Sequence, residues 1–548
     1  MTAILDKLSV GVRPYLFLAL IVFGFALYPA TNLQPLDRDE ARFMQATTQM
    51  FETDDFVQIR FQDVARNKKP IGIHWLQAVA LELSGDPLSR SPLPFRIISI
   101  LGALLCAIST FKIAEVLVNR RGGLIAGLMM ASSLLLSTEA HIAKTDAALA
   151  GFVALSFLGL AKTRFTAPKL SNTILFWFAF AMAVLIKGPV PIMVVGLAIL
   201  VMAVFDKGLL WAKPLMDLRG ILLFLAIILP WFIAIGIVTE WQFYKDAIGQ
   251  DLAPKLNGTS ENKPIPPGLH TLLAPILFWP GSILLGVAIW AGVKFRKDAK
   301  VRFLLAWIIP AWLVFELSPA KLAHYTLPTH PAIAVLAALG LLNDGWKSKT
   351  GKWLGIALYG FGLLIIGILP IYLMREYTPL TPSLGLVAAA IIGGAGLIGL
   401  AFSIKNNLAF APFALVSALA FSVLVKGQML PNLAPLDVSR RVSNALVAQK
   451  LHPRLSDNMA GRKLIGAGYQ EPSLIFLTQT NSRLDSVQNA INGAQIGDAF
   501  AIEDSQLARF KQALPKTLFL QERAIVKGLN YSKGDDVTIH IGAIVAAS

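Results

Sequence analysis

Long apolar runs separated by short polar segments make up most of the first 425 residues. A membrane-spanning helix needs roughly 20 mostly apolar residues, and the pattern predicts about thirteen such helices. They are expected at residues 15–30, 95–118, 123–138, 146–163, 173–187, 189–205, 219–238, 270–293, 303–318, 329–344, 353–374, 382–403 and 407–425. The first run continues past Pro29 and Ala30 without a small-residue cleavage site, so we expect it to be a retained span.

The composition agrees with this pattern and excludes two classes of protein. Hydrophobic residues make up 55% of the chain and charged residues 15%, whereas a soluble domain carries about 25% charged residues. A soluble globular enzyme and a disordered chain are therefore excluded. The single cysteine, Cys106, lies in an apolar run, which excludes an internal disulfide and a thiolate metal cluster.

The charge of the loops predicts the orientation of the chain in the membrane. The net charge is +16, and basic residues concentrate in alternate loops. With a cytoplasmic N-terminus, the cytoplasmic loops contain Lys7 and Arg13, Arg120 and Arg121, Lys162 to Lys169, Lys207 to Arg219, Lys294 to Arg302, Lys347 to Lys352, and Lys405. Because cytoplasmic loops are enriched in Lys and Arg, we expect a multi-pass protein of the bacterial inner membrane with the other loops periplasmic.

The unusual polar motifs collect in the loops on the periplasmic side. Two of these segments are long, residues 31–94 and 239–269. After about residue 426 the pattern changes to that of a small α/β domain. Helices are expected at 440–451, 471–479 and 505–514, and strands at 463–468, 499–502 and 537–541. We therefore expect a transmembrane domain over residues 1–426 and a periplasmic domain over residues 427–548.

An acidic motif follows the first span. Asp39 and Glu40 stand at the start of a predicted helix, and Asp39 shares a helix face with Arg42, three residues on. An acid at this position is often only a helix cap, and we weight that interpretation about evenly for Asp37. For Asp39, the adjacent cation suggests a carboxylate that activates a hydroxyl while Arg42 holds a phosphate.

Further charged groups lie at the periplasmic membrane boundary. Lys68 and Lys69 precede Pro70 and an apolar run that is expected to lie along the membrane surface. Lys144 and Asp146 either form a surface ion pair or serve a function, since charges in a membrane are costly. Four other residues have both a structural and a functional interpretation. Lys187 before Gly188 is a turn residue or a phosphate contact, and Lys321, His324 and Tyr325 are interfacial anchors or site residues.

These motifs resemble those of the ArnT-like branch of the GT-C glycosyltransferases, which is related to the protein O-mannosyltransferases. Asp39-Glu40-Ala41-Arg42-Phe43 resembles the Asp-Glu-x-Arg-aromatic motif of that branch. Lys69-Pro70 resembles its Lys-Pro motif, and Lys321-Leu322-Ala323-His324-Tyr325 resembles its Lys-Leu-x-x-Tyr motif. The resemblance covers the chain from the first loop to about residue 335, and more weakly the rest.

The resemblance implies a polytopic helical membrane protein with the GT-C fold and a small C-terminal α/β domain. It implies transfer of a monosaccharide from a polyprenyl-phosphate donor, by inverting displacement, to lipid A, lipopolysaccharide or another periplasmic acceptor. The expected catalytic residues are Asp39, Glu40 and Asp146. The expected phosphate-binding residues are Arg42, Lys69, Lys255, Lys321 and Tyr325.

The sequence departs from the family at its proposed metal ligands. Lys68 stands where the family has Glu before the Lys-Pro motif, and Gln250 stands where it has His in the second long loop. Lys255 aligns with an Arg of the family. No paired His spacing, Walker loop or dinucleotide-binding motif is present in the sequence. We therefore expect no metal cofactor, although a divalent metal stays an open alternative.

Two other functions stay open at this point. Thirteen helices would also suit a lipid or polysaccharide transporter or flippase. Transporter sites, however, lie near the bilayer midplane on broken helices, whereas these motifs lie in the periplasmic loops. A transferase that acts on protein differs only in its acceptor, which the sequence does not identify.

Overall fold

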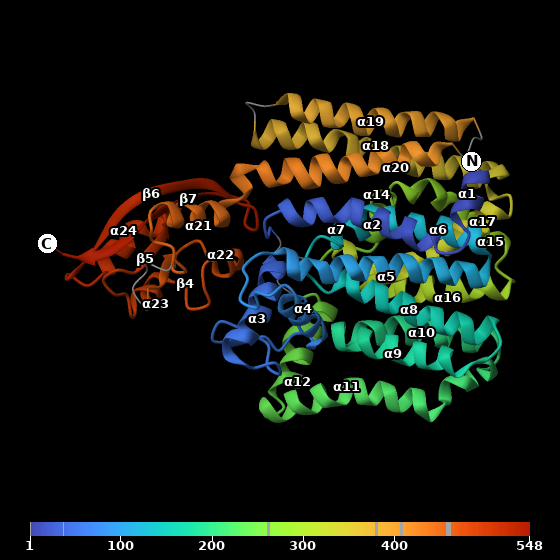
Figure 1. Cartoon of the computed structure of the whole chain (residues 1–548), viewed down its shortest axis with the longest axis horizontal. Coiled ribbons are helices and arrows are strands. Elements are labelled where there is room, and N and C mark those ends of the chain that lie inside the picture. Colours follow the sequence, from blue (N-terminus) through green and yellow to red (C-terminus); the bar gives the residue numbers. More distant parts are fainter. Residues whose placement is uncertain are drawn as a thin grey trace. The chain divides into compact units, whose positions relative to one another are not determined.

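The structure is a computed structural model that describes residues 2–36, 38–259, 264–378, 382–405, 409–455 and 462–547. The chain divides into two compact units (Figure 1). Unit 1 comprises Met1–Thr31, Arg66–Ala80 and Leu93–Gly427, and unit 2 comprises Asn32–Ala65, Leu81–Pro92 and Gln428–Ser548. The boundary at Gly427 lies beside the one expected at residue 426. Unit 2 differs from the expected C-terminal domain because it also includes most of the first long loop.

Unit 1 is a bundle in which long helices lie side by side (Figure 1). Its helices are α1 (Thr2–Leu8), α2 (Arg13–Asn32), α4 (Gly72–Leu83), α5 (Leu93–Leu117), α6 (Arg120–Ser132), α7 (Leu134–Glu139), α8 (Asp146–Phe165), α9 (Leu170–Lys187), α10 (Pro189–Phe205), α11 (Leu218–Val238), α12 (Gln242–Asp246), α13 (Ala253–Asn257), α14 (Leu269–Leu277), α15 (Leu285–Lys294), α16 (Ala299–Leu317), α17 (His330–Leu342), α18 (Lys349–Tyr377), α19 (Pro382–Ile404) and α20 (Phe410–Ala420). Short 3₁₀ segments are η1 (Leu210–Met216), η3 (Gly281–Leu284), η4 (Ala323–Thr329) and η5 (Gly345–Lys347), and π-helical segments are η2 (Ala247–Leu252) and η6 (Phe421–Met429).

The number of spans differs from the expected thirteen. Among the described residues, nine helices are long and apolar enough to cross a membrane, or ten if one bent pair counts as a span. The expected span at 123–138 is interrupted at Ser133, whose extended backbone separates α6 from α7. The span expected at 270–293 is bent by 114° between α14 and the η3–α15 segment, and α10 has only 17 residues. Broken and shortened helices therefore account for much of the difference.

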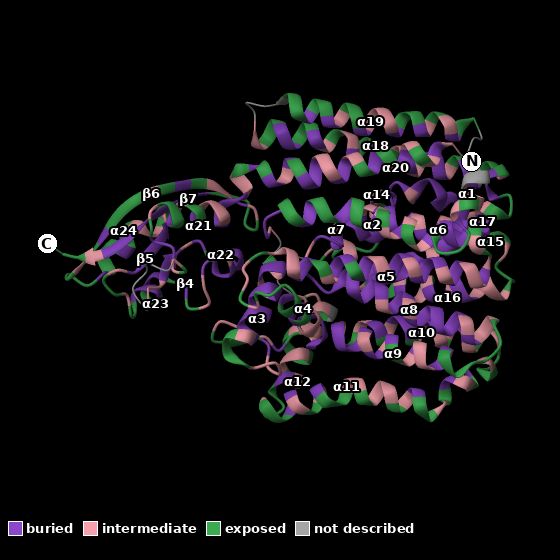
Figure 2. Cartoon of the chain, viewed as in Figure 1, coloured by how far each residue is buried: buried purple, intermediate pink, exposed green. Residues whose placement is uncertain are grey.

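Helices α5 and α8 form the centre of unit 1. The most apolar window of α8 is 83% buried and that of α5 is 61% buried, against 17% for α11 at the edge (Figure 2). Small residues allow the two central helices to approach closely, as in other membrane bundles. A Cβ atom on Gly102 of α5 would lie 2.5 Å from the Cα atom of Ala148 in α8. This contact fixes the position of α8 along its own axis relative to α5, and the first residue of α8 is Asp146.

Unit 2 contains a five-stranded sheet in the order β4-β3-β5-β7-β6. The strands are β3 (Leu464–Ala467), β4 (Arg483–Asp485), β5 (Ala499–Glu503), β6 (Leu518–Asn530) and β7 (Asp535–Ala546). Strand β3 is parallel to β4 and β5, and β7 is antiparallel to β5 and β6. The sequence pattern predicted β3, β5 and part of β7 but missed β4 and the long edge strand β6.

Helices cover both faces of this sheet. On one face, Ala499 and Ala501 of β5 pack with α21 (Val438–Ala448) and α22 (Pro472–Leu477). On the other, Phe500 and Ile502 pack with α23 (Val487–Ile491) and α24 (Asp504–Ala513). Side chains alternate between the faces of a strand, so the four apolar residues 499–502 serve two cores.

The first-loop part of unit 2 carries helix α3 (Arg38–Thr53) and a short hairpin of β1 (Arg60–Phe61) and β2 (Val64–Ala65). Helix α3 packs against α22 of the C-terminal segment. The apolar residues Ala41, Met44 and Met50 of α3 are buried. The acidic motif at the start of α3 is therefore supported by residues more than 400 positions away in the sequence.

A polar cluster around Arg90, the Arg90 cluster, joins these distant segments. The Arg90 guanidinium donates to Gln45 and Glu52 of α3, and burial lowers its pKa to about 10. Thr480, after α22, donates to Glu52 and accepts a 2.7 Å hydrogen bond from Gln45. The Gln62 amide donates to the Thr480 carbonyl at 2.8 Å. Each buried polar group thus has a partner, as a stable interior requires.

We predict that Arg90→Met loosens α3 from the C-terminal segment. Removing one partner of a buried charged hydrogen-bond network costs about 1–3 kcal/mol, which corresponds to roughly tenfold or more in a local opening equilibrium. Hydrogen-exchange mass spectrometry of the full chain should therefore show faster exchange in peptides from α3 and from residues 472–480. The matched control is Arg60→Met, because Arg60 is exposed and lies 4.0 Å from Asp55. Equal exchange in both variants and the unmodified chain would contradict the prediction.

Candidate active site

Two buried carboxylates and a histidine meet at one end of the bundle in unit 1. Asp146 is the first residue of α8 and Glu139 the last of α7, and each is about 5% exposed. His324 of η4 lies between them. Its Nδ1 is 3.5 Å from a Glu139 oxygen, and its Nε2 is 3.7 Å from an Asp146 oxygen. The break at Ser133 and the short segment η4 bring these side chains together.

Two lysines neutralise the carboxylates. Lys187, the last residue of α9, donates to Oδ1 of Asp146, and Lys144 lies 3.6 Å from Glu139. The sequence left open a Lys144–Asp146 pair, but the ion pairs in the structure are Lys144–Glu139 and Lys187–Asp146. Gly188, with φ of +55°, ends α9 directly after Lys187. Glycine adopts such a positive φ without steric cost, so the helix can end here and leave the lysine at its last position.

The Lys69-Pro70 motif lies beside the end of α9. A Cβ atom on Gly188 would be 3.6 Å from the ring of Pro70, and one on Gly72 would be 2.7 Å from the Leu185 carbonyl oxygen. Lys69, Lys144 and Lys187 all act electrostatically on the His324 ring. Lys69 is half-buried and Lys68 is exposed. The structure therefore brings Lys69 to the Asp146 cluster, by which we mean Glu139, Lys144, Asp146, Lys187 and His324.

Tyr325 and Lys321 belong to the same segment but have different surroundings. The Lys187 ammonium lies 5.9 Å from the centre of the Tyr325 ring, which places this ring at the edge of the Asp146 cluster. Lys321 is buried, and its ammonium donates to the carbonyls of Ile265 at 2.6 Å and Ser318 at 2.5 Å. Its visible role is to hold the second long loop against η4. A phosphate contact of Lys321 stays a prediction.

A buried brace that the sequence interpretation missed holds the same segment. Glu316 of α16 accepts hydrogen bonds from the backbone amides of Gly268 and Thr271, at 2.9 and 2.8 Å. It thereby caps the start of α14. The His270 ring lies 3.4 Å from Glu316, and its Nε2 is 3.1 Å from the Leu322 carbonyl oxygen. The sequence signal would have been Glu316, an acid inside an apolar helix five residues before Lys321.

Lys255 lies in the second long loop and pairs with Asp251 at 2.7 Å. In the same loop, Asp246 accepts from Gln250 and also from Asn67, two residues before Lys69, at 2.9 Å each. The second loop is thus tied to the Lys-Pro motif through Asp246. The structure does not show Lys255 in the Asp146 cluster, and its phosphate role stays a prediction.

The acidic motif lies in unit 2. Arg42 donates to Asp39 at 3.4 Å, so the predicted shared helix face is confirmed. Both side chains are partly exposed, Asp39 by 44% and Arg42 by 30%, whereas Glu40 is 1% exposed. Asp37 lies outside the described residues. Asp39 is therefore accessible to a ligand, and the burial of Glu40 favours a role inside unit 2.

Glu139, Asp146 and His324 are also the described residues closest to a metal-binding arrangement, with one ligand atom each within 4.8 Å of one another. The arrangement fits a cation poorly. Two ammonium groups already neutralise the two carboxylates, and different nitrogens of His324 face the two acids. A metal cage needs one nitrogen and both carboxylates free to turn towards the same ion.

Comparisons with known proteins show which families and folds the chain is similar to. Residues 68–233 match the family described as dolichyl-phosphate-mannose-protein mannosyltransferase. The chain is 26% identical over 371 residues to an uncharacterized protein of Aquifex aeolicus, covering 66% of this chain and 80% of that one. It is also 26% identical over 361 residues to the undecaprenyl phosphate-alpha-4-amino-4-deoxy-L-arabinose arabinosyl transferase of Pseudomonas aeruginosa. That match covers 64% of this chain and only 63% of the transferase.

The likeness to a solved structure extends over nearly the whole chain. The crystal structure of ArnT from Cupriavidus metallidurans bound to undecaprenyl phosphate superposes with a TM-score of 0.74 and 18% sequence identity. The superposition covers 96% of this chain and 97% of that one. The fold expected from the sequence motifs is thereby confirmed. Residues 68–233 are therefore similar to the dolichyl-phosphate-mannose-protein mannosyltransferase family, and the chain has an ArnT-like GT-C membrane fold.

Proposed function

We propose that the protein transfers a monosaccharide from a polyprenyl-phosphate donor to a lipid A, lipopolysaccharide-type or other acceptor on the periplasmic side of the inner membrane. The observation that carries the proposal is the Asp146 cluster with Lys69 beside it. Three ammonium groups, on Lys69, Lys144 and Lys187, accompany two carboxylates. These ammonium groups lie at the membrane boundary, where a lipid-linked phosphate would enter.

The charge of the proposed reaction suits a site that contains ammonium groups. A sugar-phosphate-polyprenyl diester carries one negative charge, and the departing polyprenyl phosphate carries two. The bond from the anomeric carbon to the phosphate oxygen breaks while a bond to the acceptor oxygen forms on the opposite face of the sugar. Cations held at fixed positions stabilise this growing charge more than they stabilise the donor, which is the requirement for catalysis.

The acceptor determines what the acids do. A hydroxyl acceptor must lose its proton as it attacks, and Asp39 is the proposed base because its carboxylate is accessible. A phosphate acceptor is already anionic, and Asp39 would then position it. Asp146 is the proposed second acid, held by Lys187, and Arg42, Lys69 and Tyr325 are the proposed contacts of the departing phosphate. None of these steps uses a metal ion.

The donor class is supported by the relatives. The arabinosyl transferase of Pseudomonas aeruginosa is named for an undecaprenyl-phosphate sugar, and ArnT of Cupriavidus metallidurans was crystallised with undecaprenyl phosphate. A polyprenyl tail lying in the membrane contributes roughly 0.8 kcal/mol per buried methylene group. This donor also agrees with a sequence that has no nucleotide-binding motif.

The direct test incubates the purified full chain with a labelled polyprenyl-phosphate sugar and a lipopolysaccharide extract. Labelled lipopolysaccharide would support the proposal. Release of free sugar would indicate a hydrolase, and lipid flipping in vesicles without transfer would indicate a transporter. The assay is run with and without a chelator. Transfer that is lost with the chelator and restored by zinc would overturn the metal-free mechanism.

Lys68 and Lys69 give a prediction about donor binding. Lys69→Ala should raise the KM for the donor by about tenfold or more, because a charge-assisted contact to phosphate contributes about 1.5–3 kcal/mol. Lys68→Ala is the matched control, since Lys68 is exposed and outside the matched motif. Its donor KM should change little. Titration of the donor in the transfer assay measures both, and equal losses would indicate only a nonspecific basic surface.

A further prediction separates catalysis by Asp39 from a structural role at the start of α3. Asp39 is the second residue of α3 and its side chain is 44% exposed, so the isosteric change Asp39→Asn should leave folding and insertion unchanged. A lost general base lowers turnover by about 10²–10⁴-fold. We therefore expect kcat to fall at least roughly a hundredfold with the donor KM little changed.

The matched control for this variant is Asp63→Asn, an exposed acid in the turn between β1 and β2 of the same loop. It should retain nearly full activity. Wild-type turnover of Asp39→Asn in the transfer assay would leave Asp39 only a structural role at the start of α3, and Asp146 would become the next candidate base.

A further inference from the structure

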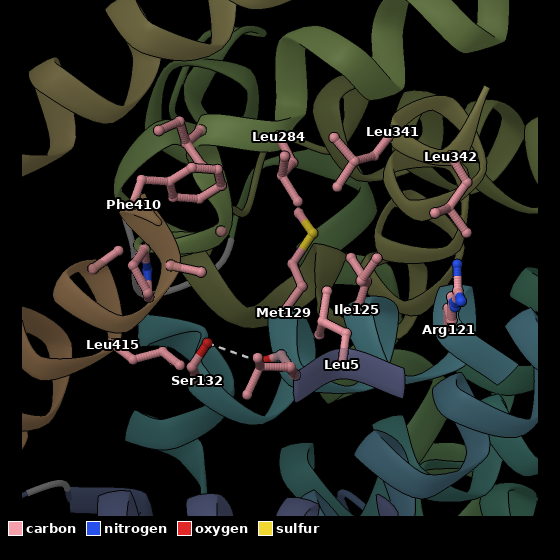
Figure 3. Close-up of a pocket in the computed structure, with 16 residues that line it drawn as sticks. Leu5, Arg121, Ile125, Met129, Ser132, Leu284, Leu341, Leu342, Phe410 and Leu415 are labelled. Atoms are coloured by element: carbon pink, nitrogen blue, oxygen red, sulfur yellow. Dashed lines mark hydrogen bonds between the residues drawn. The ribbon is translucent and has the colours of Figure 1, made fainter. Parts of the chain in front are cut away.

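An apolar hollow lies in unit 1 between α6, α17 and α20. It is near the first residues of α6 and α20 and the last residues of α17, which adjoin basic loops. Its volume is about 190 Å³. Figure 3 shows Ile125, Met129 and Ser132 of α6 on one side, with Leu284 of η3, Leu341 of α17 and Phe410 of α20 around the rest. Among the residues that the structure describes, Arg121, at its edge, is the one charged residue that lines it. The hydroxyl of Ser132 donates to the Leu128 carbonyl of its own helix, so the interior is apolar.

The length of this hollow corresponds to one leaflet of a bilayer. The α6 residues that line it are Arg121, Ile125, Leu128, Met129 and Ser132, which share one helix face. From Arg121 to Ser132 this face rises about 16 Å, at 1.5 Å per residue. Half of a bilayer's hydrocarbon core is about 15 Å thick. The hollow therefore extends from the membrane boundary to about the middle of the membrane.

The charges around the entrance favour an anion. Lys7, Arg13, Arg120 and Arg121 lie on α1, α2 and the start of α6, against the acids Asp6 and Glu115. Arg120 is held by Glu115 and by the Gly11 carbonyl. Within the part of the chain that the structure describes, Arg121 pairs with Asp6 through Nε, and its side chain is 55% exposed. A guanidinium has further N–H donors besides Nε, in a planar fork that suits a phosphate contact.

We propose that the hollow binds one acyl chain of an anionic phospholipid of the cytoplasmic leaflet, whose phosphate contacts Arg121. An acyl chain that enters at a headgroup and ends near the midplane matches the hollow in length and polarity. The loop charges predict that this end of the bundle faces the cytoplasm, where anionic headgroups attract basic residues. The lipid would fill the space between α6 and α20 and hold helix α1, which contributes Leu5 to the lining.

If the donor's polyprenyl tail occupied the hollow instead, a different experimental result would be expected. A donor tail would enter from the opposite end of the bundle, where Lys69 and the Asp146 cluster lie, and its phosphate would not reach Arg121. Blocking the hollow would then impair use of the donor. Under our proposal, blocking it removes a phospholipid and leaves the donor KM unchanged.

Native mass spectrometry of the purified full chain tests the proposal. After delipidation, the chain is titrated with phosphatidylglycerol and, separately, with phosphatidylcholine. We expect one tightly retained phosphatidylglycerol and at least about tenfold weaker retention of phosphatidylcholine. Arg121→Gln should reduce phosphatidylglycerol retention by about the same factor. Lys297→Gln, an exposed basic residue of another loop predicted to be cytoplasmic, is the matched control and should retain the lipid.

A second pair of variants tests the acyl-chain part of the site. Ala411→Trp places an indole in the lining of the hollow, whereas Val416→Trp places one on α20 at a position that is 54% exposed and does not line it. The first should lose the retained lipid and the second should keep it. Equal retention of both lipids, or no effect of Arg121→Gln and Ala411→Trp, would overturn the proposal. So would displacement by polyprenyl phosphate together with a raised donor KM in Ala411→Trp.

Discussion

The need to neutralise charge at a membrane boundary determines how unit 1 is arranged around the candidate site. An isolated carboxylate taken out of water costs several kcal/mol, and a suitably placed cation offsets much of that cost. Asp146 and Lys187 come from the start of α8 and the end of α9, so their ion pair requires these two helix ends to meet. Glu139 and Lys144 impose the same requirement on the segment after α7. Any arrangement that separated these ends would leave buried charges alone.

The ion pairs also leave the cluster ready for an anionic ligand. The lysines are held in place by carboxylates before a phosphate arrives, so the proposed reaction would need little reorganisation of the protein. The brace of Glu316 and His270 contributes in a different way, because it fixes the backbone of Leu322 and thereby the segment that carries His324 and Tyr325. In unit 2, the Arg90 cluster gives α3 a comparable support.

The sequence predicted the chemistry of the candidate site better than its geometry. Asp39, Arg42, Lys69, Asp146 and Tyr325 follow from motifs, and the Asp39–Arg42 contact follows from helical spacing. The pairing of Asp146 with Lys187 does not, because 41 residues separate them and only helix packing brings them together. Helix breaks were also hidden: nothing in the apolar run at 123–138 predicts the extended backbone at Ser133. Strand β6 was missed because its alternation is interrupted by a bulge between Glu522 and Ala524.

The close approach of α5 and α8 makes the position of Asp146 depend on an apolar residue outside the candidate site. Gly102 has no side chain. A methyl group at this position would clash with the backbone of Ala147 and Ala148, which directly follow Asp146. The position of the Asp146 carboxylate thus depends on residue 102 of the neighbouring helix having no Cβ atom. Selection for the position of Asp146 would therefore act on residue 102 as well. Even an alanine at residue 102, inside the helix bundle, would displace the start of α8 and with it Asp146.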